Sequence, residues 1–157
     1  MSIVLTRVDD RLIHGQVVVG WVQALDAKRL VLIDDDVRAN QWERDLYALG
    51  VPAGLELHFV SVAEATQLIQ SWSGDAKKTI LLLGNVETTV SLCNSVAGID
   101  QVNVGGLHER EGRSQRLPYL YLTESEARQL KELHDRGIQV TAQDVPTAKA
   151  LPVDGWT

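Results

Sequence analysis

The stretch SIVLTRVDDRLIHGQVVVGW, Ser2–Trp21, combines the clearest fold signal in the chain with its densest group of reactive side chains. Ser2–Val8 has the apolar and β-branched residues of a strand. Gly15–Leu25 is apolar on most sides, as a buried helix would be, although Val17–Val19 alone would also suit a strand. A strand, a polar connection and a helix form the repeating unit of α/β proteins, so the stretch predicts a fold of that class.

The same alternation continues to the end of the chain. Lys28–Asp35 is a continuous Val, Leu and Ile run that ends in acids, which is typical of a central parallel strand. The other expected strands are Leu55–Ser61, Lys78–Asn85, Ile99–Gly106, Leu117–Thr123 and Ile138–Val145. The other expected helices are Val37–Gly50, Val62–Trp72, Val86–Val96 and Glu124–Gly137. About seven strands alternating with five helices predict a single-domain, open, mostly parallel sheet with helices on both faces.

Local signals indicate where some of these helices begin and end. Ser61 is a candidate N-cap, and Thr123 with Glu126 forms a capping box. Trp21 and Trp42 fall within expected helices, and we expect both in the core.

The composition bounds the class of protein. The chain has 157 residues, 45% hydrophobic and 23% charged, which favours one globular domain over residues 1–157. A formal net charge of -6 argues against sequence-independent nucleic-acid binding and against electrostatic attachment to anionic lipid. The single cysteine, Cys93, excludes an internal disulfide and a cysteine-based zinc site, and fits the cytoplasm. The N-terminal residues lack the basic region of a secretory signal, and no apolar run is long enough to cross a bilayer.

Chemistry is expected at the connections from strands to helices. In open α/β sheets, ligands bind beyond the carboxyl ends of the strands, near the point where the strand order reverses. The candidate connections are Asp9–Gly15, Asp34–Asp36, Ser61, Gly84–Asn85 and Asn103–His108. The first is the richest in reactive groups.

His14 stands at the expected start of the first helix. A histidine taken alone is more often structural or merely exposed, but the unpaired N–H groups and the dipole of a helix start favour an anion beside this ring. A phosphoryl group carried by His14 would fit this setting. The expected donors to its oxygens are the amides of Gly15, Gln16 and Val17 and the guanidinium groups of Arg7 and Arg11.

Asp9 and Asp10 precede this histidine, and their carboxylates would act on its imidazole ring and not as donors to the phosphoryl group. An imidazole that attacks phosphorus through one nitrogen needs its proton on the other, and a carboxylate such as Asp9 could hold that proton. Asp10 could line the same site. The alternative is a solvated turn with a local ion pair, worth at most about 1 kcal/mol.

Other polar positions are weaker candidates. Within NVGGLH, the residues that could line the site, or equally form a tight structural turn, are Asn103, Gly105, Gly106 and His108. Asp34 could line it as well, and the acidic run that it begins could bind Mg²⁺ or simply form a hydrophilic strand exit. His58 and His134 are expected to be packed or exposed residues without a chemical function.

These residues resemble a known family. RVDDRLIHGQV, Arg7–Val17, is similar to the active-site segment of the IIB proteins of the mannose/fructose/sorbose class of the bacterial sugar phosphotransferase system. The resemblance continues in VLIDDDVRAN, in NVGG followed by His108, and in GIQV with a late Val-Pro, so it spans essentially the whole chain.

The resemblance implies a phosphohistidine carrier with the α/β fold of that family. His14 would accept a phosphoryl group from a IIA protein and pass it to a sugar bound by the membrane components IIC and IID; relatives suggest Nδ1 as the modified nitrogen. The resemblance implies no cofactor and no metal, a cytoplasmic protein that associates peripherally with the permease, and, as often in the family, a homodimer. It does not indicate which sugar is moved.

The chain departs from the family at two places. It has LGNVETT, Leu83–Thr89, where several relatives carry an aromatic-basic stretch. It has Gln143 and Asp144 where relatives often place an arginine before the final Val-Pro. Phosphate binding would then depend more on Arg11 and Arg7.

Two other classes of function stay open from the residues alone. A metal-dependent enzyme could use Asp9, Asp10 and His14 as ligands, although the nearby arginines would oppose a cation and three ligands so close in sequence converge poorly. A non-catalytic nucleotide- or effector-binding α/β module could use the glycines and acids at the strand ends.

Overall fold

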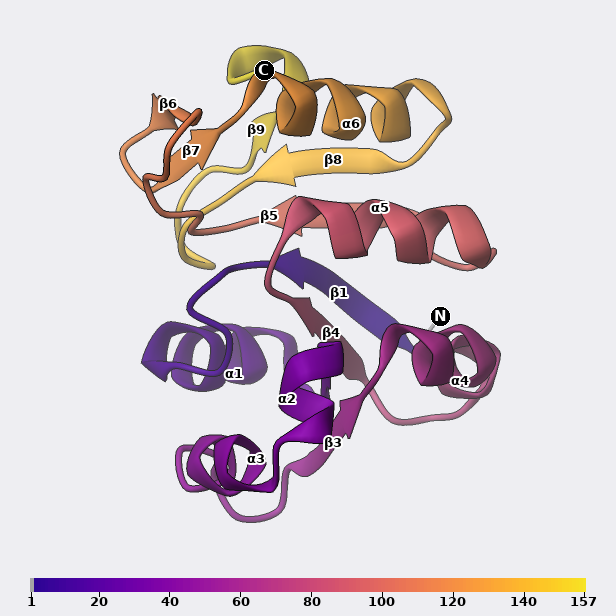
Figure 1. Ribbon diagram of the computed structural model, residues 1–157. Coiled ribbons are helices and arrows are strands. Elements are labelled where there is room, and N and C mark those ends of the chain that lie inside the picture. Colours follow the sequence, from indigo (N-terminus) through magenta and orange to yellow (C-terminus); the bar gives the residue numbers. More distant parts are fainter. Residues whose placement is uncertain (1) are drawn as a thin grey trace.

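The computed structural model describes residues 2–157 and contains a seven-stranded sheet with the order β3-β2-β4-β1-β5-β8-β9 (Figure 1). Neighbouring strands are parallel, except that β8 and β9 are antiparallel. The strands are β1 (Ile3–Val8), β2 (Arg29–Ile33), β3 (Glu56–Val60), β4 (Thr79–Leu83), β5 (Gln101–Val104), β8 (Gln139–Ala142) and β9 (Leu151–Pro152).

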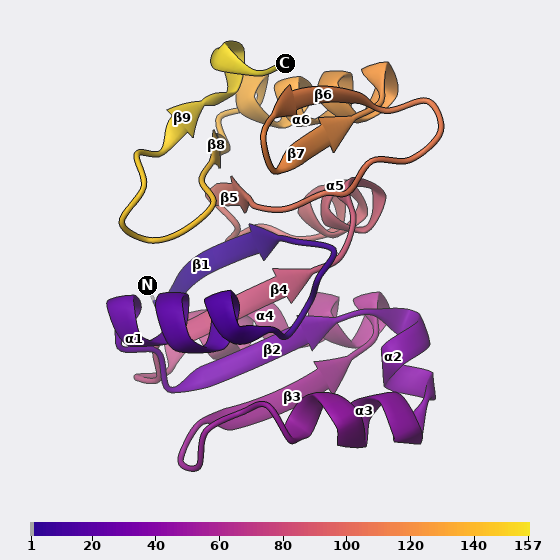
Figure 2. The ribbon, with the colours of Figure 1, turned by 90° about the vertical axis from the view of Figure 1, so that its left-hand side faces the viewer.

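Helices cover both faces of this sheet. Figure 2 shows α1, α2 and α3 in front of the strands and α4 behind them. The helices are η1 (Gln16–Trp21), α1 (Val22–Leu25), α2 (Asp35–Ala39), α3 (Gln41–Ala48), α4 (Val62–Gly74), α5 (Val86–Ser95), α6 (Glu124–Asp135) and the short turn η2 (Val153–Gly155). The predicted fold class, an open and mostly parallel α/β sheet with helices on both faces, is confirmed.

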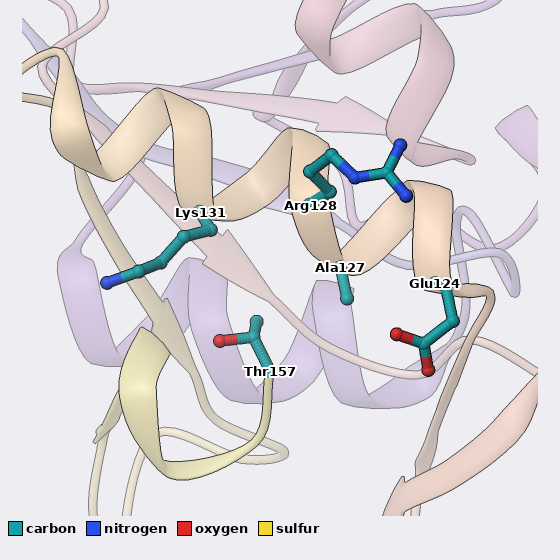
Figure 3. Close-up of a pocket in the computed structure, with 5 residues that line it drawn as sticks. All are labelled: Glu124, Ala127, Arg128, Lys131 and Thr157. Atoms are coloured by element: carbon teal, nitrogen blue, oxygen red, sulfur yellow. The ribbon is translucent and has the colours of Figure 1, made fainter.

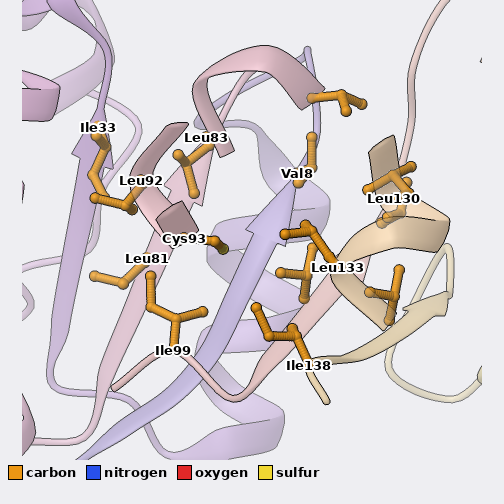
Figure 4. Packing of buried hydrophobic residues seen from close by; sticks show 14 of the residues in the cluster. Val8, Ile33, Leu81, Leu83, Leu92, Cys93, Ile99, Leu130, Leu133 and Ile138 are labelled. Carbon is orange, nitrogen blue, oxygen red and sulfur yellow. The ribbon is translucent and has the colours of Figure 1, made fainter. Parts of the chain in front are cut away.

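The central strands separate two hydrophobic cores. Successive side chains of a strand point to opposite faces, so Ile33 packs in one core and Leu32 in the other. The larger core, part of which Figure 4 shows, joins the strands to α4, α5 and α6. The second core lies under η1 and α1. Because both faces are covered, β2 and β4 contain continuous apolar runs, at residues 30–33 and 80–83.

The first helix begins with an unusual geometry. The segment predicted as one helix, Gly15–Leu25, consists of the π-helix η1 followed by one turn of α-helix, α1. The N–H of Val22 donates to the carbonyl of Val17, five residues earlier. Such wide turns are rare and occur most often at functional sites. This one begins two residues after His14.

The predicted helix Val37–Gly50 is two helices. Asn40 lies between α2 and α3, and its side chain accepts the N–H of Glu43 and so caps α3. The break turns Trp42 outward, where it is 72% exposed, so its prediction as a core residue was wrong. The burial predicted for Trp21 is confirmed, at 4% exposure.

The later strands also differ from the expected arrangement. The segment Leu117–Thr123 does not join the main sheet; β6 (Ser114–Leu117) and β7 (Leu120–Leu122) form a separate antiparallel hairpin, with Pro118 in its turn. The main sheet instead gains β9 from the C-terminal segment, which shows no strand pattern in the sequence. A two-residue strand is too short to produce a periodic signal.

The strand order places a topological switch at the centre of the sheet. Strands β1 and β5 are neighbours, and the chain leaves β1 toward β2 on one side and β5 toward β8 on the other. Ligands of open α/β sheets bind at such a point, beyond the carboxyl ends of the strands. No helix in residues 2–157 is both long and apolar enough to cross a membrane.

Candidate active site

The loop between β1 and η1 is fixed by backbone hydrogen bonds to its neighbours. The N–H of Asp9 donates to the carbonyl of Leu83 at 2.9 Å, and the N–H of Asp10 donates to the carbonyl of Gly106 at 2.9 Å. The N–H of Leu12 closes a turn on the carbonyl of Asp9 at 3.1 Å. The loop is therefore tied to β4 and to the segment after β5, on the two sides of β1.

Leu12 holds this loop in a strained conformation. Its φ of 58° is left-handed, which costs a residue other than glycine about 1–3 kcal/mol. The residue is 9% exposed, and its side chain lies over Gly84, where a Cβ atom would approach Leu12 Cδ2 to 2.9 Å. Burial of Leu12 over this glycine offsets the strain and fixes the position of His14, two residues later.

Asp9 is the centre of the charged group. Its side chain is fully buried, and its carboxylate accepts two hydrogen bonds from the Arg11 side chain, Nε to Oδ1 at 2.9 Å and Nη2 to Oδ2 at 2.7 Å. Nη2 of Arg7 donates to Oδ2 at 3.2 Å. The pair with Arg11 is bidentate, the strongest geometry for an arginine and a carboxylate.

Arg7 lies beneath Asp9 and has no exposed surface. Its Nη1 donates to Oδ1 of Asn103 at 2.5 Å and to the carbonyl of Gln143 at 2.8 Å, and its Nη2 donates to the carbonyl of Asp144 at 2.8 Å. Its guanidinium carbon lies 4.9 Å from the ring centroid of Trp21. The prediction that Arg7 contacts a phosphoryl group directly was therefore wrong. Both terminal nitrogens of Arg7 already donate hydrogen bonds within the protein and are shielded from solvent, so Arg7 instead holds Asp9 in place.

Gly105 and Gly106 make room for the two arginines. A Cβ atom on Gly105 would overlap Nη2 of Arg7 and would lie 2.7 Å from Oδ2 of Asp9. A Cβ atom on Gly106 would lie 2.9 Å from Nε of Arg11. Glycine is therefore required at both positions of the predicted NVGG turn, because a side chain there would prevent the backbone from approaching the guanidinium groups closely.

The ring of His14 lies between a carboxylate and a backbone amide. Its Nε2 is 3.5 Å from Oδ2 of Asp9, and its Nδ1 accepts the N–H of Gln16 at 3.3 Å. The side chain of Gln16 is held in turn by Nη1 of Arg11, which donates to Oε1 at 2.7 Å. The His14 side chain is 20% exposed, so the ring is supported from the interior and reachable from solvent.

The charges of this group act on the pKa of its members. Burial alone would raise the pKa of Asp9, but the neighbouring His14 ring, the hydrogen bonds from Arg11 and the charge of Arg7 outweigh it and bring the pKa well below its usual value. Burial lowers the pKa of Arg7, and the hydrogen bond to Asp9 raises that of Arg11. Asp9 is therefore a carboxylate at neutral pH.

Asp10 and His108 come together, while Asp34 has a different partner. Oδ1 of Asp10 lies 2.6 Å from Nδ1 of His108, and Oδ2 accepts the backbone N–H of His108 at 2.8 Å. Asp34 accepts the N–H of Val37 at 2.9 Å and caps α2. Its position at the strand exit thus has a structural explanation.

The expected donors at the helix start lie next to His14. Gly15 is exposed, with no atom within 4 Å of the position that a Cβ would take, and Gln16 is half-buried. The side chain of Val17 is fully buried in the second core, which anchors the first turn of η1. Gly15 is the N-cap of η1, and Gln16 and Val17 are its first two residues.

Gln143 and Asp144 also belong to the site, although in the sequence they stand out only as departures from a family pattern. Besides the contacts of their carbonyls with Arg7, Gln143 Oε1 accepts from Asn103 at 3.2 Å, and Asp144 Oδ1 lies 3.7 Å from Nη2 of Arg11. Both follow β8 at its carboxyl end. The rule that selected the other connections would have selected this one too.

The geometry offers little to a metal ion. Over residues 2–157, no group of three or more histidine, cysteine, aspartate or glutamate side chains is arranged to hold one. Asp9 faces two arginines, while Asp10 turns toward His108. The arrangement instead joins a solvent-reachable imidazole, a carboxylate on one ring nitrogen and cationic donors, which suits transfer of an anionic group.

Comparison with known proteins identifies the family. The family model of the PTS system sorbose subfamily IIB component matches residues 3–156. The chain belongs to this family. Such IIB components take part in phosphotransfer during sugar uptake and work with IIA proteins and a IIC/IID permease.

Individual relatives of this IIB protein agree with that assignment. The N-acetylgalactosamine-specific phosphotransferase enzyme IIB component 1 of Escherichia coli (strain K12) is 31% identical, over 92% of this chain and 92% of its own. The PTS system fructose-specific EIIB component of Bacillus subtilis (strain 168) is 29% identical, over 94% and 90%. The PTS system mannose-specific EIIAB component of E. coli (strain K12) is 31% identical, over 96% of this chain but 47% of its own length.

Solved structures of the family have the same fold. The IIBSor domain of the sorbose permease from Klebsiella pneumoniae superimposes with a TM-score of 0.89 at 26% identity, covering 99% of this chain and 96% of that domain. The N-acetylgalactosamine-specific IIB component 1 from E. coli superimposes with a TM-score of 0.88 at 30% identity, covering 95% and 97%.

Proposed function

We propose that His14 of this IIB protein accepts a phosphoryl group from the phosphohistidine of a IIA protein and donates it to a sugar held by the IIC/IID permease. The observation that carries the proposal is the position of the His14 ring, which is partly exposed, with Asp9 beside Nε2 and the amide of Gln16 donating to Nδ1. Membership of the family supports the general reaction, and these contacts support the choice of His14 as the residue that carries the phosphoryl group.

The nitrogen that attacks phosphorus is Nδ1 in this proposal. A carboxylate near Nε2 favours a proton there, and an N–H group pointing at Nδ1 requires a lone pair on that atom. As the Nδ1–P bond forms, the ring becomes positively charged, and the buried carboxylate of Asp9 stabilises that charge. The same carboxylate repels the phosphoryl oxygens, which keeps the group transferable.

Arg11 and the amides of Gly15, Gln16 and Val17 neutralise the phosphoryl oxygens. Arg11 is partly exposed, and its Nη1 is bonded to the uncharged side chain of Gln16, which an anion could replace. Arg7 acts indirectly by fixing Asp9. Transfer between two nitrogens passes through a loose transition state, so positioning and charge neutralisation are the main requirements.

The test is transfer from a labelled donor. The protein is incubated with a IIA protein that has been phosphorylated from labelled phosphoenolpyruvate through the upstream carriers. We expect one acid-labile, base-stable phosphohistidine, lost in His14→Ala and retained in His134→Ala, the matched control on α6. Label on any other residue would overturn the assignment.

Arg11→Ala tests separately whether the Arg11 guanidinium binds the phosphoryl oxygens. Removal of one preorganised donor to a developing oxyanion slows a reaction by about 100-fold or more, and we expect a loss of that order in the loading rate. The variant should remain folded, as circular dichroism can verify, because Asp9 keeps its contact with Arg7. Transfer at the wild-type rate would show that Arg11 does not bind the phosphoryl oxygens.

A further inference from the structure

The proposed second transfer has a chemical requirement that the first does not. Transfer from one histidine to another moves a phosphoryl group between nitrogens, and no proton needs to leave the attacking atom. Transfer to a sugar uses a hydroxyl oxygen, whose proton must be accepted in the transition state by a nearby base. Asp9 is engaged with two arginines and His14, so another group is needed.

A pocket lies beside Arg11, on the side of the loop that faces the segment after β5. Its volume is about 390 Å³, within the size range of small-molecule sites, about 300–1,000 Å³. Its wall includes Arg11, His108, Glu109, Pro118, Tyr119 and Tyr121. Tyrosine rings beside charged donors and acceptors suit a sugar, which has an apolar ring face and hydroxyl groups at its edge.

The wall of this pocket is built by the small hairpin. The N–H of Leu107 donates to the carbonyl of Tyr119 at 3.1 Å, and the N–H of Tyr121 donates to the carbonyl of Leu107 at 3.0 Å. Leu107 and Leu120 are fully buried and form a β-bridge. The hairpin β6–β7, seen at the upper right in Figure 2, is thereby docked on the segment that carries His108.

His108 has the geometry of a proton acceptor. Asp10 lies 2.6 Å from its Nδ1, which favours the proton on that nitrogen and leaves a lone pair on Nε2. The Asp10 side chain is 7% exposed and that of His108 68%, so a buried carboxylate supports an exposed ring. The other charged or titratable groups of the pocket are Arg11, Glu109, Tyr119 and Tyr121, and Arg113 binds the His108 carbonyl.

Two other hollows do not share these properties. A groove of about 830 Å³ on the η1 side of the loop is mostly apolar, with Val19, Gly20, Ala24 and Pro146 in its wall, and contains no acid or base. The hollow on α6 in Figure 3 is lined by Glu124, Ala127, Arg128, Lys131 and Thr157 and contains no residue of the site.

We propose that the pocket beside Arg11 receives the acceptor hydroxyl end of the sugar, and that His108 accepts the hydroxyl proton during the second transfer. The inference rests on the proposed function of His14. The sugar oxygen forms a bond to phosphorus while the Nδ1–P bond of His14 breaks and its electron pair returns to Nδ1. The hydroxyl proton moves to Nε2 of His108, and Asp10 stabilises the resulting imidazolium.

The two transfers can be measured separately. Loading of His14 is followed with a labelled IIA donor, and unloading is followed after addition of membrane vesicles that contain the IIC/IID permease and its sugar. Loss of a general base slows a reaction by about 10²–10⁴-fold. We expect His108→Gln to slow unloading at least tenfold more than loading, and Asp10→Asn to act in the same direction. His134→Gln, on α6, serves as the control and should alter neither step.

A structural role for His108 would give different results. In the wild type, the unloading rate should rise with pH through the ionisation of one group and then level off, and this dependence should disappear in His108→Gln. Added imidazole should restore part of the unloading rate in His108→Ala, because the position is open to solvent. Equal slowing of both transfers, or no rescue by imidazole, would overturn the proposal. Absence of label on His14 in the wild type would instead overturn the proposed function.

Discussion

Two charged clusters at opposite ends of the sheet contain nearly the same residue types. At the carboxyl end, Arg7 is bound to Asp9 beside His14. At the amino end, Arg29 donates to Glu56 at 2.6 Å and to Asp75 at 2.8 Å, and His58 lies 2.8 Å from Glu56. Each cluster therefore combines an arginine, carboxylates and a histidine, but only one of them looks like an active site.

The difference lies in burial and in the surrounding backbone. Asp9 is fully buried, whereas Glu56 and Asp75 are 34% and 37% exposed. The carboxyl-end cluster is surrounded by glycines that admit guanidinium groups and by the strained Leu12. The Arg29 cluster fastens the starts of β2, β3 and β4 together. Residue composition alone does not define an active site. Charged side chains must also be held in fixed positions and shielded from water.

The largest expected effect concerns the two buried arginines. Arg7→Met should lower the free energy of unfolding by about 3–5 kcal/mol, because it removes a partner from a fully buried carboxylate. Arg29→Met should cost less, since water can reach Glu56 and Asp75. Urea denaturation of both variants measures the difference. Equal losses, or a larger loss in Arg29→Met, would contradict the contrast.

Gly105→Ala tests the space beside Arg7. The added methyl group overlaps the guanidinium, and overpacking of this kind costs about 1–3 kcal/mol. We also expect slower loading of His14, because Asp9 must move. Gly74→Ala, at the end of α4 with no atom near the new Cβ, is the matched control and should change stability by at most about 1 kcal/mol. A Gly105→Ala variant as stable and active as this control would refute the close approach.

Acid should lower the free energy of unfolding because it protonates Asp9. The pKa of Asp9 is lower in the folded state than the unfolded value of about 3.9, so its contribution to stability is present above that pH and is lost as the pH falls further. Asp9→Asn should reduce the slope of unfolding free energy against pH below about pH 4, by at most about 1.4 kcal/mol per pH unit. The pKa of Glu56 is also lowered, by hydrogen bonds with Lys77, Arg29 and His58, but its exposure weakens the effect.

Denaturation at a series of pH values, with Glu56→Gln as the comparison, measures these slopes. A larger change in Glu56→Gln than in Asp9→Asn would show that the exposed cluster dominates acid unfolding.

The smallest effect is expected for the second histidine. His58→Gln should change the free energy of unfolding by less than about 1 kcal/mol, because its pair with Glu56 is partly exposed. Loading of His14 should be unchanged, whereas His14→Gln should abolish it. A loss of phosphorylation in His58→Gln would mean that the two ends of the sheet are coupled.

Much of the fold was predictable because its signals are local. The buried strand at residues 29–33 is a continuous apolar run, and the capping box of Thr123 and Glu126 needs only residues three apart. The break at Asn40 was missed, since one capping side chain interrupts an otherwise helical pattern. The hairpin β6–β7 was missed as a separate sheet, because its partner strand, residues 114–117, is polar and carries no apolar periodicity.

The candidate site was predictable in part for the same reason. His14, Asp9 and Arg11 lie within six residues, so a motif can reveal them. Gln143 and Asp144 contact Arg7 only through their backbone carbonyl groups. Every residue has such a carbonyl, so the sequence gives no sign of this contact. The exposure of Trp42 and the burial of Arg7 also depend on neighbours distant in the chain.

The sequence by itself determined the α/β class, the position of the reactive loop and the residues that surround His14, since apolar periodicity and close spacing act over short distances. Only the tertiary structure decided that Arg7 lies beneath Asp9, that Asp10 turns to His108, and that a hairpin closes a pocket beside Arg11. Those relations depend on which strands become neighbours, and the strand order is set by packing of the whole chain.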